Sequence, residues 1–271
     1  MLEDEIVEVT SRAALSNIVK YFGIPKDEVF FRLCEDLSTT KHAFTRPQPM
    51  MIPPFHTFII EALEFQGGYL LQEDAKSYFH QFEMPEHARP LFGGLLGDER
   101  GHFVPVRMRV LSMGFHKSPS YWQRFSNGIC NYTKTAIRTK SALPTRINPW
   151  IDNFIMSSPT VGQAVMARDT FRAACSTFGV TLKRTDLEPA QEMTCLSVLL
   201  DTRLRTFALS PKFTENLTTT VQTVPMNTPR GAFQWIGRLL WGAFVLRVPL
   251  AAFPEVVGYM SRTCRPTDTD I

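Results

Sequence analysis

Hydrophobic residues along this chain follow two periods, one typical of helices and one typical of strands. Where apolar residues recur every three or four positions, as Ala14, Ile18 and Tyr21 do, the pattern predicts an amphipathic helix. Where apolar and polar residues alternate, as in residues 103–110, it predicts a strand. The expected helices are residues 11–22, 55–65, 118–132, 161–178 and 230–244. The other expected strands are residues 68–72, 146–156 with a turn at 149–153, 180–182, 193–200 and 207–209.

Helices and strands therefore follow one another in mixed order. This favours an α+β fold, with an antiparallel sheet and helices on one side. Chain breakers agree with the boundaries: the proline-rich residues 46–54 can continue neither a helix nor a central strand, and Gly67 and Gly179 end the helices before them. Pro119 stands near the first turn of the helix expected from residue 118.

Composition indicates a sizeable core but does not select a function. The chain has 271 residues, 44% of them hydrophobic, and a net charge of +3. Such a mildly basic chain tolerates a polyanionic partner without requiring one. Its five cysteines form no Cys-x-x-Cys or Cys/His cluster, so we expect a reducing, intracellular compartment, nuclear or cytoplasmic, and no structural zinc site. No apolar run reaches the roughly 18 residues of a membrane span, so no membrane partner is expected.

Two aspartates stand at positions suited to metal-dependent chemistry. Asp74 follows an expected apolar strand, and Asp152 lies in the short turn between two others. Carboxylates from adjacent strand ends can hold Mg²⁺, which prefers oxygen ligands, and two such ions can assist phosphoryl transfer. Asp also favours helix caps and turns, and either residue taken alone is better explained that way.

Several segments between residues 31 and 253 resemble, in order, the motifs of retroelement reverse transcriptases. FRLCEDLS (31–38) is similar to a fingers segment that begins R-x-x-x-D, and EDAKSYFHQF (73–82) is similar to the first catalytic motif. LSMGFHKSPSYWQ (111–123) resembles LP-x-G-x-x-x-SP-x-x-FQ, the most specific match, and WIDN (150–153) falls where the family has Y-x-D-D. Residues 178–182 and 195–197 resemble the family's later G-x-x-L and F-L-G motifs. Residues 228–241 resemble the thumb region of long-terminal-repeat and tyrosine-recombinase (kinetoplastid-type) retroelements.

The resemblance implies a right-hand polymerase fold and an activity. Residues 1–70 would form part of the fingers, 71–200 the palm with an inserted fingers segment at 85–125, and 201–271 the thumb or connection. The implied function is that of an RNA-directed DNA polymerase that uses Mg²⁺, with Mn²⁺ as an alternative. Its implied partners are an RNA template, a DNA primer or product, and deoxynucleoside triphosphates.

The resemblance also implies roles for particular residues. The catalytic set would be Asp74, Asp152 and Asn153, with the two aspartates as metal ligands. Phe79 would exclude a 2′-hydroxyl by its bulk, and Arg32 would bind the triphosphate with its planar guanidinium. Without the motifs, Phe79 would be interpreted as a core aromatic and Arg32 as a solvated surface residue. The remaining implied sites are a nucleotide pocket at Met113, Gly114, Ser118 and Pro119, and a primer-holding turn at Cys195, Leu196 and Ser197.

The sequence departs from the family pattern at four places. Asn153 replaces the second aspartate of the Y-x-D-D turn and offers one neutral carbonyl oxygen in place of a charged carboxylate, which weakens metal attraction. Trp150 replaces the tyrosine of that turn, and Ser197 replaces a glycine. The general-acid lysine has no clear counterpart: Lys183 is the nearest lysine, and Asp186 occupies the aligned position.

Three hypotheses follow from these observations. The chain is an active polymerase weakened by Asn153, a decayed module of the same fold that binds nucleic acid or a protein partner without chemistry, or a structural subunit unrelated to nucleic acid. Fold alone does not decide function, so the metal site must separate the first two hypotheses. Asn153 is the residue that divides them best.

Overall fold

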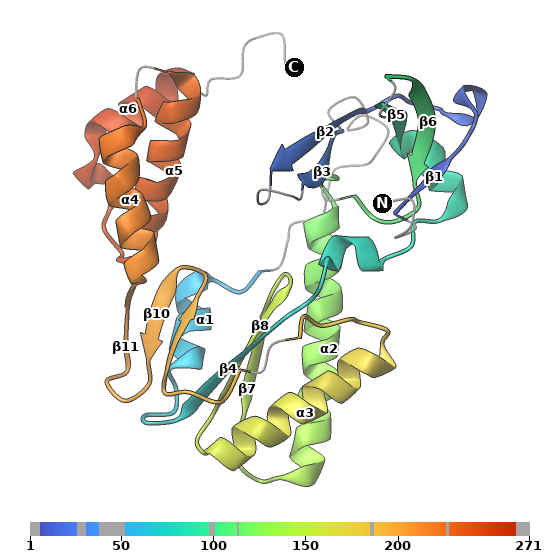
Figure 1. The fold of residues 1–271 in the computed structure, drawn as a ribbon. Coiled ribbons are helices and arrows are strands. Elements are labelled where there is room, and N and C mark those ends of the chain that lie inside the picture. The colour runs from blue at the N-terminus through green and yellow to red at the C-terminus, as the bar shows by residue number, and fades with distance from the viewer. Residues whose placement is uncertain are drawn as a thin grey trace.

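The computed structural model describes residues 6–25, 31–37, 52–97, 101–112, 114–184, 187–225 and 228–263. Figure 1 shows three groups of elements. A central sheet with its helices lies at the base, small sheets from the N-terminal part lie above it on one side, and the C-terminal helices lie above it on the other.

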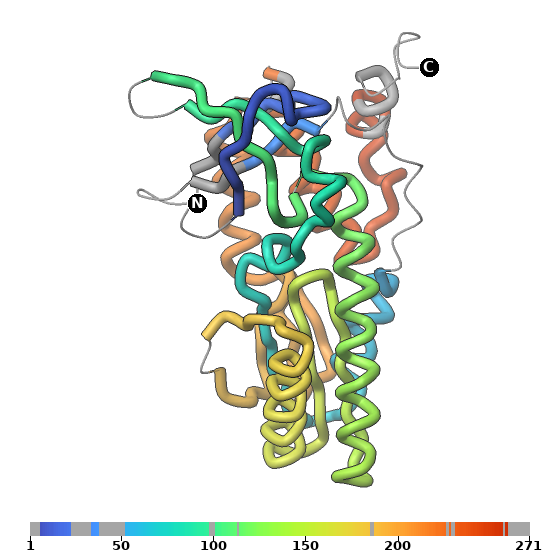
Figure 2. Tube along the Cα trace, turned by 90° about the vertical axis from the view of Figure 1, so that its right-hand side faces the viewer, coloured from blue at the N-terminus to red at the C-terminus, as the bar shows by residue number. Residues whose placement is uncertain are grey.

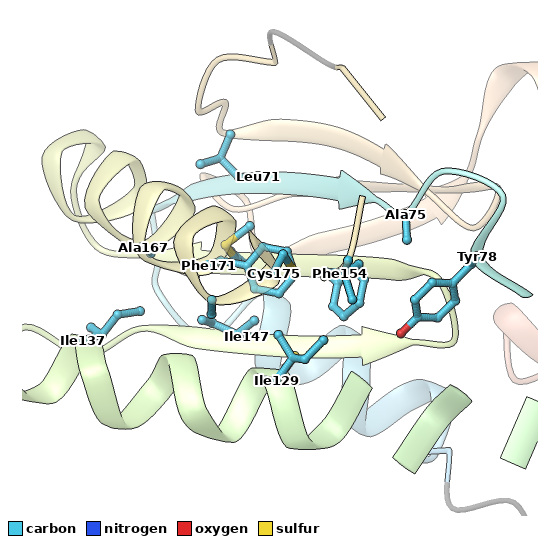
Figure 3. Packing of buried hydrophobic residues seen from close by; sticks show 14 of the residues in the cluster. Leu71, Ala75, Tyr78, Ile129, Ile137, Ile147, Phe154, Ala167, Phe171 and Cys175 are labelled. Atoms are coloured by element: carbon cyan, nitrogen blue, oxygen red, sulfur yellow. The ribbon is translucent and has the colours of Figure 1, made fainter. Parts of the chain in front are cut away.

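The central sheet is antiparallel and has three strands in the order β4-β8-β7. The strands are β4 (Tyr69–Asp74), β7 (Arg146–Trp150) and β8 (Asn153–Ser158). Helices α2 (Ser118–Lys140) and α3 (Val161–Thr177) lie against one face of this sheet, as Figures 2 and 3 show. Buried side chains from both layers fill the space between them, and each contributes about 1.5–3 kcal/mol by leaving water. Among them are Leu71, Ile129, Ile147, Phe154 and Phe171.

The opposite face of the sheet is covered over part of its length by a helix and a second three-stranded sheet. These elements are α1 (Phe55–Ala62), β9 (Glu192–Cys195), β10 (Val198–Asp201) and β11 (Thr206–Leu209). Because side chains alternate along a strand, Leu71 joins the core with α2 and α3, whereas Leu70 packs with Phe55, Ile155 and Val198 on the other face.

Two small antiparallel sheets come from the N-terminal part of the chain, one in the order β1-β6-β5 and one a pair of β2 and β3. Their strands are β1 (Val7–Val9), β2 (Lys20–Pro25), β3 (Phe31–Asp36), β5 (Gly93–Gly97) and β6 (Phe103–Met108). Short 3₁₀ helices lie nearby at η1 (Arg12–Ala14), η3 (Tyr78–Gln81) and η4 (Glu86–Phe92). Tyr21 of β2 donates a 2.8 Å hydrogen bond to the Phe92 carbonyl oxygen, which links the two sheets.

The C-terminal helices are α4 (Pro211–Thr223), α5 (Pro229–Val245) and α6 (Pro254–Thr263), with η5 (Leu250–Ala252) between the last two. The side chains of Ser210 and Thr228 cap α4 and α5 by accepting hydrogen bonds from Phe213 N (3.2 Å) and Gly231 N (3.1 Å), and each cap is followed by proline. Among the described residues, none of the helices combines the length and apolar composition that a bilayer span requires.

Most expected elements are present, including the helices near residues 55–65, 161–178 and 230–244. The fold is a mixed α/β arrangement with antiparallel sheets, as the pattern predicts. Helix α2 runs eight residues past the expected end at residue 132, to Lys140. Its second half is rich in Thr, Lys and Arg, which hides the buried positions Thr133 and Ile137.

The helix expected at residues 11–22 is wrong. Only Arg12–Ala14 turn, and the chain enters β2 at Lys20. Pairing with β3 and a bridge from Val19 to Gly94 outweigh the local helical period.

The single strand expected at residues 193–200 is also wrong. It is the hairpin β9–β10, which turns at Leu196 and Ser197 with φ of +49° and +66°. Residues 180–182 form only one bridge, from Leu182 to Ala75. The stretch at residues 46–51 lies outside the described residues.

Candidate active site

Asp74, Asn153 and Trp150 form a row across the ends of three strands. Asp74 is the register partner of Asn153, and Asn153 is the partner of Trp150. Cross-strand partners share a face of the sheet, and Trp150 packs against the rings of Phe55 and Phe58 with centroids 5.8 and 5.6 Å away. The row therefore lies on the face that carries α1, opposite α2 and α3.

The turn that bears Asp152 is held by side chains of α2. Gln123 accepts a 2.8 Å hydrogen bond from Ile151 N and donates one of 3.1 Å to Pro149 O, and Ser126 donates one of 2.7 Å to Ile151 O. Gln123 and Ser126 are fully buried. These bonds hold Ile151 at a φ of +57°, a strained value for a β-branched residue. The glutamine that ends the 111–123 motif thus positions the turn, a role the sequence does not reveal.

Asp74 and Asp152 lie side by side. Asp152 O accepts a 3.0 Å hydrogen bond from Ala75 N, directly after Asp74. Burial raises the pKa of Asp152, and the negative charge of Asp74 raises it further. The structure thus brings together the two carboxylates that the motifs single out.

The amide of Asn153 is engaged at both ends. Its Nδ2 donates to Asp152 Oδ1 at 3.1 Å, and its Oδ1 accepts from Gln72 Nε2 at 2.9 Å. The one oxygen that Asn153 could offer a metal therefore already has a donor. Gln72, two residues before Asp74 on the same face of β4, carries no sequence motif that points to this contact.

Lys183 is paired with Asp74. Its Nζ lies 2.5 Å from Asp74 Oδ2, and its backbone N donates a 2.7 Å hydrogen bond to Asp74 O. Two residues before Lys183, Thr181 is held by a pair of hydrogen bonds with Gln81, 2.8 and 2.9 Å long. Asp74 Oδ1 is buried and has no hydrogen-bond partner among the described residues. Asp186, the aligned alternative to Lys183, lies outside the described residues.

The pair Asp74 and Asp152 fits a hard divalent cation in its chemistry. Both ligands are carboxylates, one buried oxygen lacks a donor, and the adjacent charges disfavour each other unless a cation joins them. Within the described ranges, no group of three or more His, Cys, Asp or Glu side chains is arranged to hold a metal. An ion there would need further oxygens from water or from substrate phosphates.

Phe79 lies in η3, which begins just after Ser77 at a φ of +47°. Its ring packs edge-on against Trp122 of α2, with centroids 6.2 Å apart. Its neighbour Tyr78 is buried against the same indole at 3.7 Å and is hydrogen-bonded to Ser126. Phe79 is half-buried and lies in the turn that follows Asp74.

The loop of residues 111–119 packs on β3. A side chain at Gly114 would come within 2.5 Å of the Glu35 carbonyl oxygen, so only glycine permits this approach. Ser118 is fully buried and donates a 2.6 Å hydrogen bond to Ser112 O, while Pro119 stands in the first turn of α2. Met113 lies outside the described residues. The backbone of Arg32 belongs to β3, and the position of its side chain is not described.

Cys195, Leu196 and Ser197 form the tip of the β9–β10 hairpin. Cys195 is buried in the apolar cluster with α1, and Leu196 packs against that cluster. Ser197 O accepts a 2.9 Å hydrogen bond from Ser210 N, at the residue that caps α4. The tip therefore lies where the central part of the molecule meets the C-terminal helices, as Figure 1 also shows.

No protein-family profile matches the chain, and no curated protein matches it. Among solved structures, it is similar to a foamy viral protease–reverse transcriptase in complex with double-stranded DNA. The TM-score is 0.69 at 12% sequence identity, over 89% of this chain and 38% of that one. The chain therefore has a fold similar to a fragment of a reverse transcriptase, and it spans about two fifths of that neighbour's length. At this identity the likeness concerns the fold alone.

Proposed function

We propose that the chain is an RNA-directed DNA polymerase of a retroelement, of the long-terminal-repeat or tyrosine-recombinase class. The observation that carries this proposal is the side-by-side placement of Asp74, at the end of β4, and Asp152, in the turn between β7 and β8. Within the described part of the chain, the buried Oδ1 of Asp74 has no donor. Template-directed nucleotidyl transfer depends on positioning and on electrostatic stabilisation of phosphate charge, and such a pair supplies both.

Asp74 and Asp152 would hold Mg²⁺, or Mn²⁺ in its place. When bound, the metal would lower the pKa of the attacking hydroxyl and neutralise the charge on the leaving phosphate. The chain's own residues have separate tasks. Gln123 and Ser126 keep the Asp152 turn in place, and Asn153 orients the Asp152 carboxylate by donating to it. Lys183, whose side chain is half exposed beside Asp74, would be the proton donor for the leaving pyrophosphate.

The remaining expected roles follow from the same proposal. Phe79 would exclude a 2′-hydroxyl, and Arg32 would bind the triphosphate. Residues 113–119 would shape the nucleotide pocket, and residues 195–197 would hold the primer end. Residues 1–70 and 85–125 would act as fingers, the rest of 71–200 as palm, and 201–271 as thumb. The partners would be an RNA template, a DNA primer and deoxynucleoside triphosphates, and the structural neighbour, which is bound to double-stranded DNA, supports a nucleic-acid partner.

The test is primer extension on poly(rA)/oligo(dT) with and without Mg²⁺. We expect extension by the wild type and none by Asp74→Asn or Asp152→Asn, because each removes half of the charge that holds the metal. Asp169→Asn is the matched control: this aspartate is 61% exposed on α3 and pairs with the adjacent Arg168, so extension should persist. A wild type that shows no metal-dependent extension, or variants that extend normally, would contradict the proposal.

A second candidate function is a module that binds nucleic acid without chemistry. Two observations favour it. Lys183 forms an ion pair with Asp74 and so offsets its negative charge, and Asn153 has a neutral amide where a third carboxylate would stand. This candidate predicts tight binding of a primer–template that is independent of Mg²⁺ and unchanged in Asp74→Asn. Binding measured by fluorescence anisotropy in parallel with extension separates the two functions.

A further inference from the structure

A buried carboxylate, Glu35, lies in β3 next to the 111–119 loop. It is 6% exposed, and no cation of the described residues forms an ion pair with it. Burial raises the pKa of Glu35, while hydrogen bonds from the Ser112 hydroxyl and the Gly114 backbone N–H oppose that rise. A buried carboxylate held only by neutral donors costs stability relative to an apolar residue of similar shape, so its presence calls for a reason.

Two donors to Glu35, the Ser112 hydroxyl and the Gly114 N–H, belong to the loop that opens α2, and a third is the backbone N–H of Glu35 itself. Ser112 is fully buried and donates its hydroxyl proton to Glu35 Oε2, and its own Oγ accepts a 3.1 Å hydrogen bond from Gly114 N. Ser112 O in turn accepts the 2.6 Å bond from Ser118 Oγ, the first residue of α2. The chain of bonds therefore runs from β3 through the loop to the helix start.

Ser112 and Glu35 are matched to each other. Ser112 stands where the motif that the loop resembles has proline, and a proline there could not donate to Glu35. Gly114 adds a steric contact to the same strand, because its Cα approaches the Glu35 carbonyl oxygen too closely for a side chain. The loop is thus fixed on β3 by side chain, backbone and shape together.

We propose that Glu35 is a positioning residue: its carboxylate fixes the loop of residues 111–118 against β3 and so sets the geometry of the pocket that receives the nucleotide's triphosphate. The inference rests on the proposed polymerase function for the identity of the ligand. The coupling itself rests only on the contacts of Glu35. Arg32 lies three residues before Glu35 on the same strand, so a loop that shifts relative to β3 also shifts relative to Arg32.

The experiment measures KM for a deoxynucleoside triphosphate and kcat in Glu35→Ala, Ser112→Ala and the double variant. We expect KM to rise about tenfold in each single variant with kcat changed by less than about threefold. The double variant should be no worse than the poorer single one, because both remove the same contact. Glu35→Gln keeps an oxygen that accepts from Ser112, so it should restore most of the wild-type KM.

Thr133→Val is the control for a merely structural effect. Thr133 lies on α2 and is as fully buried as Ser112. Its hydroxyl donates a 2.8 Å hydrogen bond to Ile129 O in the same helix, so it does not connect to another element through this bond. It should lower the melting temperature without changing KM. If Glu35→Ala and Ser112→Ala behave like Thr133→Val, Glu35 is only a core residue and the inference is wrong.

Amide hydrogen exchange provides a readout that needs no activity. Glu35→Ala should speed exchange at Gly114 and Phe115, whereas Thr133→Val should not. Unchanged exchange at these two amides overturns the coupling whether or not the protein extends primers. Absence of Asp74-dependent extension, by contrast, counts against the proposed function alone, and the exchange result then decides the coupling.

Discussion

At the scale of single residues, Asn153 is the substitution with the clearest consequence. Its side chain donates to Asp152 and accepts from Gln72, so it fixes the geometry of the site while lowering its charge. We expect Asn153→Asp to raise the apparent affinity for Mg²⁺ and the extension rate by about tenfold, since about 1.4 kcal/mol of added attraction suffices. A titration of extension rate against Mg²⁺ checks this.

The matched control at the same position is Asn153→Ala. It removes the bond to Asp152 without adding charge and should lower the rate. If Asn153→Asp and Asn153→Ala lower the rate equally, the neutral amide is needed as it stands, and the charge explanation fails.

Phe79 carries a second expectation at this scale. Its ring lies in the turn after Asp74 and packs on Trp122, so its position is fixed. Phe79→Ala should raise the relative kcat/KM for ribonucleotides over deoxynucleotides at least about tenfold, because the ring no longer meets a 2′-hydroxyl. Competition between UTP and dTTP on poly(rA)/oligo(dT) measures this ratio. Tyr78, which is buried against the same indole, should show no such change when replaced by Phe.

The motifs predicted part of this site and missed part for a physical reason. Asp74 and Asp152 could be found because each stands at a strand end within a recognisable local pattern. The contacts of Gln72 with Asn153 and of Lys183 with Asp74 join residues 81 and 109 positions apart. The first contact depends on the register between β4 and β8, and the second on a single bridge between Ala75 and Leu182; a local pattern encodes neither.

At the scale of elements, α2 is the support of the Asp152 turn. Gln123→Ala would leave Ile151 N and Pro149 O without their buried partners, at a cost of about 1–3 kcal/mol. We expect a lower melting temperature together with a fall in kcat larger than that caused by Asn131→Ala, an exposed change on the same helix. Thermal unfolding and extension assays on both variants give the comparison. Normal kcat in Gln123→Ala would show that the turn keeps its geometry without Gln123.

A second element-scale expectation concerns β1, which Glu8 ties to β6. Burial raises the pKa of Glu8, but hydrogen bonds and charge from Arg107 (2.5 Å) and Arg89 (3.3 Å) outweigh it and hold that pKa below its ordinary value. A depressed folded-state pKa gives stability above the unfolded pKa that is lost as pH falls through the folded one. Glu8→Gln should therefore lower stability at pH 7 by about 1 kcal/mol, and the difference should shrink below about pH 4.

The control is Glu86→Gln, because Glu86 is 81% exposed and 3.9 Å from Arg107. It should be neutral at every pH. Melting curves from pH 3 to pH 8 test both variants, and a Glu8→Gln effect that is constant across this range would assign it to packing.

The sequence predicted helices and strands correctly where a local pattern of residues determines them. It failed where the structure of a segment depends on pairing with a distant strand. The helices α3 and α5 follow from period and caps, and β4 and β8 from apolar runs. The segment at 11–22 has helical spacing, yet Tyr21 and Phe22 pair with β3 and the segment becomes a strand. Helix α4 was missed because it is rich in Thr, which has weak helix propensity. Its apolar period is short, since it consists of Phe213, Leu217 and Val221 among mostly polar residues.

At the scale of the whole molecule, an aromatic joint connects the C-terminal helices to the central sheet. Trp241 and Phe244 of α5 meet Phe55 of α1 at 5.1 and 5.6 Å, and Phe55 in turn meets Trp150 at 5.8 Å. The helices above the sheet in Figure 1 are therefore linked by packed rings to the strand end that bears the Asp152 turn. The contacts of Phe55 with Trp150 and Trp241 are edge-to-face, and such contacts add about 0.5–1.5 kcal/mol each beyond the burial of area.

We expect Trp241→Ala to weaken the packing between α5 and α1 more than it lowers the activity of the Asp74–Asp152 site. Loss of a large aromatic costs about 3–5 kcal/mol when fully buried, and Trp241 is only partly buried, so the cost should be smaller. If the α4–α6 group acts as a thumb on the primer–template duplex, single-nucleotide addition should remain near wild type while the length of products made per binding event falls several-fold. Extension in the presence of excess trap duplex measures that length.

Phe233→Ala is the matched control, since Phe233 is a 49% exposed aromatic of the same helix and, within the part of the chain that the structure describes, makes no ring contact with Phe55. Equal losses of single-nucleotide addition and product length in Trp241→Ala would mean that the joint supports the site itself and that the C-terminal helices do not hold the duplex independently.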